Sequence, residues 1–218
     1  MRYPLIFPLI LIVILAVAQA TDIRQVAARS ALMLEMNPDP ATVANWTFDG
    51  SQDGAEFGYA VAAAGDVNGD GFADVIIGAP LYSRQTPEGV DREGAAFVFL
   101  GSSSGLGATP DWVMGSSMQG AAFGSSVAAA GDVNGDGFAD VIIGAPEYKV
   151  DFGMSGEPKS GAAFVYYGSE TGLSLAPDWF VLAEAAEIRL GDAVAGAGDV
   201  NGDGFDDVIV GASLFSGG

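Results

Sequence analysis

The stretch GDVNGDGFADVIIGAP at residues 65–80 decides the fold, because it returns twice along the chain. It recurs letter for letter at residues 131–146, and the close variant GDVNGDGFDDVIVGAS occupies residues 198–213. The leading aspartates of the copies set a period of 66 or 67 residues: Asp66, Asp132 and Asp199. A fixed period of this length predicts one supersecondary unit repeated in tandem.

The remainder of each unit recurs in the same register. The segment GAAFVFLG at residues 94–101 recurs as GAAFVYYG at 161–168, and the triplet Pro-Asp-Trp at 110–112 recurs at 177–179. Three units therefore start near residues 57, 123 and 190. Each start carries a Phe-Gly pair, less faithfully in the third copy: Phe57-Gly58, Phe123-Gly124 and Leu190-Gly191.

Each full unit is expected to hold four short strands, in the first unit near residues 59–64, 75–78, 95–100 and around Trp112. The second strand is a continuous apolar run, so both of its faces need cover. A radial stack of similar sheets supplies that cover, which is the architecture of a β-propeller. We therefore predict an all-β chain, a partial β-propeller of about two and a half four-stranded blades, with little helix beyond the leader.

Three tryptophans share one position of the repeat: Trp46, Trp112 and Trp179. They could form a binding stripe, but equal spacing at one blade position favours a packing role. Trp46 falls where a fourth strand would lie, without three strands before it, as expected if the first and last blades share strands. Closed propellers have about four to eight blades, so we expect the chain to be truncated at its C-terminus or to close with further repeats or copies.

The repeated loop has the pattern DxNxDGxxD, with oxygen-bearing side chains at alternate positions. Such a set, without sulfur or imidazole, favours Ca²⁺, which takes about six to eight oxygen ligands; Mg²⁺ demands stricter octahedral geometry. Glycines at positions four and six let the chain curl around the ion. The phenylalanine at position seven is expected to offer its carbonyl while its ring turns into the core. We predict one Ca²⁺ per loop, three in the chain, held by Asp66, Asn68, Asp70, Phe72, Asp74, Asp132, Asn134, Asp136, Phe138, Asp140, Asp199, Asn201, Asp203, Phe205 and Asp207.

The loop pattern allows two other interpretations. The acidic residues could form ordinary Asp/Asn/Gly turns without a metal, but three copies in register make this less favoured. An EF-hand opens in the same way but needs a bidentate Glu at position twelve, between two helices. That position holds Ile77, Ile143 or Val210, so the EF-hand is excluded.

The Phe57-Gly58 pair, the loop at residues 66–74 and the Gly-Ala-Pro triplet at 78–80 together resemble the FG-GAP repeat of integrin α-subunit propellers. The resemblance covers most of residues 46–213. It implies blades of a seven-bladed propeller, Ca²⁺ between the first two strands, and a role in adhesion or ligand binding. The third copy departs from the pattern at Leu190 and Ser213 and adds Asp206, but it keeps every ligand position.

Composition narrows the classes of function. The net charge of −20, from 28 acidic and 8 basic residues, argues against nucleic acid or anionic lipid as a partner and for a cation. The absence of His and Cys excludes thiolate nucleophiles and His-dependent triads. Because the recurring acids are accounted for by metal ligation, we expect no enzymatic activity in this segment.

The first twenty residues read as a signal peptide, with an apolar stretch before the small-x-small sequence Ala18-Gln19-Ala20. An uncleaved anchor is the competing interpretation, but the stretch is short for a membrane span. We expect a leader or linker at 21–44, repeats at 45–218 and no membrane span in the mature chain. The product would be secreted, extracellular or at the cell surface, and periplasmic in a bacterium.

The leading functional hypothesis is a calcium-binding adhesion or interaction module for an extracellular protein or glycan ligand. Its contact surface would be the variable connections at residues 81–93 and 147–160. The alternative is a non-catalytic accessory repeat region of a secreted hydrolase or lyase. A third hypothesis is a purely structural stalk, which would capture no partner.

Overall fold

The computed structural model describes residues 46–50, 52–86, 89–150 and 159–216, and every regular element in these ranges is a β-strand. The predicted signal peptide at 1–20 and the segment at 21–44 lie outside the described residues. Within the described ranges, no helix has the length and apolarity that a membrane crossing requires.

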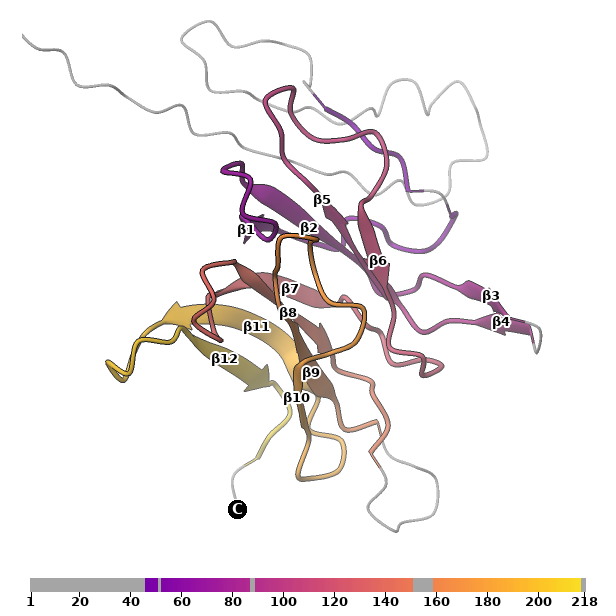
Figure 1. The fold of residues 1–218 in the computed structure, drawn as a ribbon. Helices are drawn as coiled ribbons and strands as arrows, with labels where there is room; N and C mark the ends of the chain where they lie inside the picture. Colours follow the sequence, from indigo (N-terminus) through magenta and orange to yellow (C-terminus); the bar gives the residue numbers. More distant parts are fainter. Residues whose placement is uncertain (1–45, 51, 87–88, 151–158, 217–218) are drawn as a thin grey trace, which may run out of the picture.

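Two sheets follow the predicted four-stranded plan (Figure 1). The first blade has the antiparallel order β1-β2-β5-β6, and the second has β7-β8-β9-β10. The third unit contributes a two-stranded sheet of β11 and β12. The prediction of a partial propeller of about two and a half blades is confirmed. The strands are β1 (Ala60–Gly65), β2 (Asp74–Ala79), β5 (Ala95–Phe99), β6 (Trp112–Met114), β7 (Ser126–Gly131), β8 (Asp140–Ala145), β9 (Ala162–Tyr166), β10 (Trp179–Leu182), β11 (Leu190–Gly198) and β12 (Asp207–Ala212).

The connection from β2 to β5 contains a hairpin that the sequence did not predict. Its strands are β3 (Arg84–Thr86) and β4 (Gly89–Asp91), which pair antiparallel and project from the body of the first blade (Figure 1). The guanidinium of Arg84 reaches back to the buried carboxylate of Glu93 at 2.7 Å. This ion pair ties the hairpin to the blade.

The second strand of each full blade is covered on both faces, as predicted from its unbroken apolar run. In β2, Ile76 packs into the core between the first and second blades, whereas Val75 and Ile77 pack into a second core on the other face. In β8, Ile142 belongs to the core shared with the third unit. Neighbouring units therefore cover both faces of β8, whereas the second face of β2 is covered by Trp46 and Phe48 of the segment before the first blade.

The glycines of the repeat let neighbouring blades approach each other closely. A Cβ added to Gly78 would lie 1.9 Å from the carbonyl oxygen of Gly124, in the next blade. The same contact recurs one blade later, where a Cβ on Gly144 would lie 2.0 Å from the oxygen of Gly191. The glycine near the end of one blade's second strand thus meets the first glycine of the following unit, and a side chain at either position would separate the blades.

Two of the tryptophans pack against the face of a blade, which confirms the packing prediction for them, and Trp112 does so between two blades. Trp112 donates its indole N–H to the carbonyl of Ser174 at 3.0 Å and meets the ring of Tyr166 edge-on, 5.1 Å between centroids. Trp46 makes the same pair of contacts, with Gly107 at 2.7 Å and with Phe99 at 4.9 Å, although it lies outside any strand. Trp46 therefore has the packing role of a fourth-strand residue without strand pairing.

Candidate metal centres

Each acidic loop joins the first and second strands of its unit. All three loops lie at the same end of the stack (Figure 1). The strand register shifts just before each loop, at Gly65, Gly131 and Gly198. These glycines have φ of 86°, 86° and 67°, a conformation that residues with a side chain rarely adopt. The sequence therefore sets the point at which the strand ends and the loop begins.

The aspartate at position one organises the loop by accepting backbone N–H groups. In the second loop, Oδ1 of Asp132 accepts from Gly135 at 2.7 Å and from Asp136 at 3.0 Å, while Oδ2 accepts from Gly137 at 2.9 Å. Asp199 makes the same three contacts in its loop, and Asp66 accepts from Asp70 and Gly71 in the first loop. Hydrogen bonds from the backbone, that of Gly204 first, lower the pKa of Asp199.

Positions three and five close the loop with shorter-range contacts. Oδ1 of Asn68 accepts from the N–H of Asp70 at 3.2 Å, and Oδ1 of Asp70 accepts from Phe72 at 2.9 Å. The other two loops repeat both contacts through Asn134, Asp136, Asn201 and Asp203. The three loops therefore share one conformation, in which predicted ligand atoms hold the loop's own backbone.

The aspartate at position nine has a structural role that the sequence analysis missed. Asp140 is fully buried; one oxygen accepts from Val133 at 2.8 Å and the other from Gly168 at 2.8 Å, beyond the end of β9. Asp74 does the same with Val67 and Gly101. Desolvation raises the pKa of Asp140 to about 6, although the two N–H groups act to lower it. The contact with Gly168 spans 28 residues, so no local pattern reveals it.

The phenylalanine rings at position seven do not turn into the core, so that part of the prediction was wrong. Phe72 and Phe205 are 41% and 46% exposed. The ring of Phe138 lies over the preceding loop, where a Cβ on Gly69 would come within 2.6 Å of it, and Phe205 lies in the same way over Gly135. The ring packs on the neighbouring repeat because the loops stack, which a single repeat does not indicate.

The loops also touch through their backbones. The N–H of Ala139, at position eight of the second loop, donates to the carbonyl of Asp66 in the first loop at 3.0 Å. Asp206 donates to the carbonyl of Asp132 at 3.1 Å in the same way. Adjacent loops are therefore one connected structure.

Within the described ranges, no three or more acidic, histidine or cysteine side chains are grouped closely enough to hold a metal ion. The donor set nevertheless fits a hard cation. It contains only oxygen ligands, and an ionised carboxylate has about four acceptor sites, of which backbone N–H groups use one or two on each oxygen. Asp66 and Asp70 also lie near enough to Asp74 to raise its pKa, after the larger effect of burial. Convergent negative charge of this kind is what a bound cation would offset.

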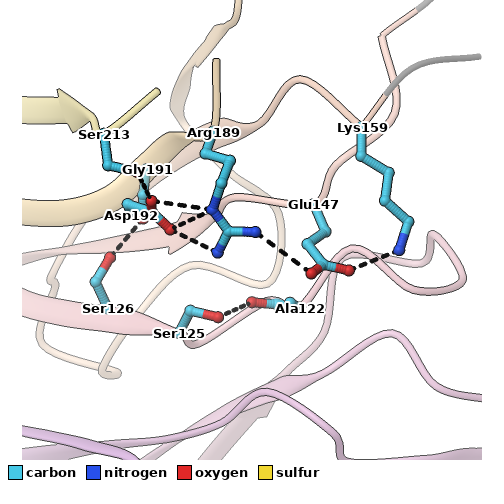
Figure 2. A network of polar contacts seen from close by, with 9 residues as sticks. All are labelled: Ala122, Ser125, Ser126, Glu147, Lys159, Arg189, Gly191, Asp192 and Ser213. Carbon is cyan, nitrogen blue, oxygen red and sulfur yellow. Dashed lines mark hydrogen bonds and ion pairs between the residues drawn. The ribbon is translucent and has the colours of Figure 1, made fainter. Parts of the chain in front are cut away.

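The third unit departs from the repeat pattern at several residues that are joined by hydrogen bonds (Figure 2). Ser213, in the place of Pro80 and Pro146, donates its hydroxyl to Asp192. Asp192 also accepts from the guanidinium of Arg189 at 2.8 Å, and Arg189 reaches Glu147 of the second blade at 3.5 Å. Burial opposes ionisation of Asp192, but the bonds from Arg189 and Ser213 lower its pKa overall. A polar network thus occupies the place of the proline at this junction.

Repeated four-stranded blades with an acidic loop between their first two strands define a partial β-propeller. The family model described as FG-GAP repeat matches residues 57–99, 123–166 and 190–218, and the chain belongs to this family. The curated relatives include integrin alpha-5 of Xenopus laevis, 36% identical over 172 residues, and integrin alpha-V of Gallus gallus, 35% identical over 191 residues. Integrin alpha pat-2 of Caenorhabditis briggsae is 38% identical over 177 residues.

These matches cover most of this chain and little of the relatives. They extend over 77%, 85% and 74% of the chain, but over 16%, 18% and 14% of the three integrin α subunits. The chain thus spans less than a fifth of the length of these relatives. The similarity concerns the repeat region alone.

Proposed function

We propose that the chain is a calcium-binding, extracellular FG-GAP propeller segment that serves as an adhesion or ligand-interaction module and has no catalytic activity. The observation that carries this proposal is the recurrence of one loop conformation at the same end of three stacked units. The similarity to integrin α subunits supports the choice of an interaction module over an enzyme.

The cation would be held by oxygens at positions one, three, five, seven and nine of each loop. It would supply positive charge that offsets the repulsion between the carboxylates. The chain's own residues do the rest. The aspartate at position one fixes the turn, and the buried aspartate at position nine ties the loop to the end of the third strand. We propose Ca²⁺ because a flexible all-oxygen loop tolerates its irregular coordination better than the octahedral demand of Mg²⁺.

The topology separates the cation loops from the proposed contact surface. In each full blade, the acidic loop precedes the second strand and the variable connection follows it, so the two lie at opposite ends of β2 and of β8. We propose that Ca²⁺ stiffens one end of the stack while the connections at 81–93 and 147–160 contact an extracellular protein or glycan at the other.

The proposed organisation has a cleaved signal peptide at 1–20, a leader at 21–44 and FG-GAP repeats at 45–218. It places the mature chain outside the cell or at its surface, with further repeats or copies completing the ring. Support comes from the apolar leader and the match to integrin α subunits.

Thermal unfolding of the full chain in Ca²⁺, in Mg²⁺ and in chelator tests the calcium proposal. A ligand at about a hundred times its Kd stabilises the folded state by about 2.7 kcal/mol, so Ca²⁺ should raise Tm by several degrees and more than Mg²⁺ does. A variant with Asp70, Asp136 and Asp203 all changed to Ala should lose the Ca²⁺ effect. An unchanged Tm in Ca²⁺ would refute calcium binding.

A further inference from the structure

We infer that Asp206, which belongs to the third loop by sequence, is a positioning residue for the second loop. It would raise the affinity of that loop for its cation. The inference rests on the calcium binding proposed above, and it concerns the one loop residue by which the third copy departs from the first two. In those copies the same position holds Ala73 and Ala139.

The contact between Asp206 and the second loop has two hydrogen bonds. Oδ2 of Asp206 accepts from the backbone N–H of Asp132 at 2.9 Å, and its own N–H donates to the carbonyl of Asp132 at 3.1 Å. Asp132 occupies position one, whose carboxylate gathers three N–H groups of its loop. Asp206 therefore holds both backbone polar groups of the residue on which the second loop is built.

The carboxylate of Asp206 fits beside residue 131 because that residue is a glycine. A Cβ at residue 131 would lie 2.0 Å from Oδ2 of Asp206, a distance that no side chain could keep. At the equivalent junction, a Cβ on Gly65 would lie 2.4 Å from Cβ of Ala139. The same glycine therefore leaves space that a carboxylate occupies at one junction and a methyl group at the other.

The first and second loops have identical sequences over residues 65–80 and 131–146, so they differ only in their neighbours. Ala139 keeps the backbone bond to Asp66 but has no side-chain acceptor to offer. The first loop has another neighbour of its own, since the N–H of Ser169 donates to the carbonyl of Val67 at 3.0 Å. The informative comparison is therefore between variants of one loop, and not between the two loops of the unaltered chain.

Two physical effects act in the same direction. Asp132 is hydrogen-bonded through both its N–H and its carbonyl, so it is already ordered before the cation binds. Binding therefore costs less conformational entropy. A further carboxylate beside the loop also adds negative charge that a cation relieves. Both effects raise the affinity of the second loop and leave the first unchanged.

The test is a calcium titration of the full chain followed at the backbone amide signals of Gly71, Gly137 and Gly204. Each of these N–H groups donates to the position-one carboxylate of its own loop, so each reports one site. In Asp206→Ala, the apparent Kd at Gly137 should rise about three-fold to ten-fold, the scale of one lost hydrogen bond. The Kd at Gly71 should stay within about two-fold of its original value, since Asp206 contacts the second loop.

Two further variants separate the hydrogen bond from the charge. Asp206→Asn keeps an acceptor oxygen and should retain most of the affinity at Gly137; a loss as large as that of Asp206→Ala would overturn the positioning role. Ala139→Asp builds the same contact at the first loop and should lower the Kd at Gly71 only. An unchanged Kd there, or equal effects of Asp206→Ala on all three loops, would contradict the inference. If no glycine signal responds to Ca²⁺, the proposed calcium binding itself fails.

Discussion

The aspartates of the loop differ in what they do for the folded chain. Asp136 is exposed and bonds only within its own turn, whereas Asp140 is buried and joins the loop to the backbone beyond β9. A sequence pattern treats both as ligands. Their surroundings make one of them part of the fold with or without a cation.

Changing Asp140 to Ala should therefore destabilise the protein even in chelator. The N–H groups of Val133 and Gly168 would lose their acceptor, at about 1–3 kcal/mol for each buried group left unpaired. The matched control, Asp136→Ala, should lower the free energy of unfolding in chelator by less than about 1 kcal/mol. Urea unfolding of both variants without metal measures the difference, and equal losses would contradict the structural role of Asp140.

At the level of the strand, the blade interface depends on aromatic residues that recur once per repeat. Trp112 is 7% exposed and fills the junction between β6 and the second blade, whereas Trp179 is 43% exposed. The same residue type at the same repeat position thus buries different amounts of surface.

Trp112→Ala should cost about 3–5 kcal/mol of stability, as expected for loss of a buried aromatic side chain. Trp179→Ala, the control at the equivalent position, should cost clearly less. Denaturant unfolding of the two variants makes the comparison. A similar loss in both would show that the tryptophans do not act through burial between blades.

The network at the start of β11 predicts a pH dependence. The folded-state pKa of Asp192 is below the ordinary value of 3.8, so its contribution to stability is present above that pH and is lost as the pH falls through the folded-state pKa. Asp192→Asn should therefore cost about 1 kcal/mol at pH 7 and progressively less below pH 4. The exposed Glu184→Gln serves as control. A loss from Asp192→Asn that does not change between pH 7 and pH 3 would contradict the ionic role.

The elements themselves were largely predictable because the repeat fixed them. The expected strand at 75–78 is observed as β2, Asp74–Ala79, and the expected strand at 95–100 as β5, Ala95–Phe99. The hairpin of β3 and β4 was missed because its short, polar strands lack the alternation that marks a half-buried strand. The ring positions of Phe138 and Phe205 were mispredicted because they depend on contacts between repeats, one full period apart in sequence.

At the scale of the whole chain, the units are joined through contacts at both ends of their strands. The glycines of the repeat meet at one end, and the acidic loops stack at the other. Cations bound in the loops would thus act on the junctions between blades as well as on single turns. The ends of the variable connections take part in these junctions, since the N–H of Phe123 donates to the carbonyl of Glu93 and the N–H of Leu190 to the carbonyl of Ser160, both at 3.0 Å.

The number of calcium ions bound per chain tests the central claim most directly. Isothermal titration of the metal-free full chain with Ca²⁺, with metal analysis of the dialysed product, should give one ion for each of the loops led by Asp66, Asp132 and Asp199. Asp136→Ala should bind one ion fewer while keeping its fold. A chain that binds no Ca²⁺, or a variant that binds as many ions as the original, would contradict the assignment of these loops as calcium sites.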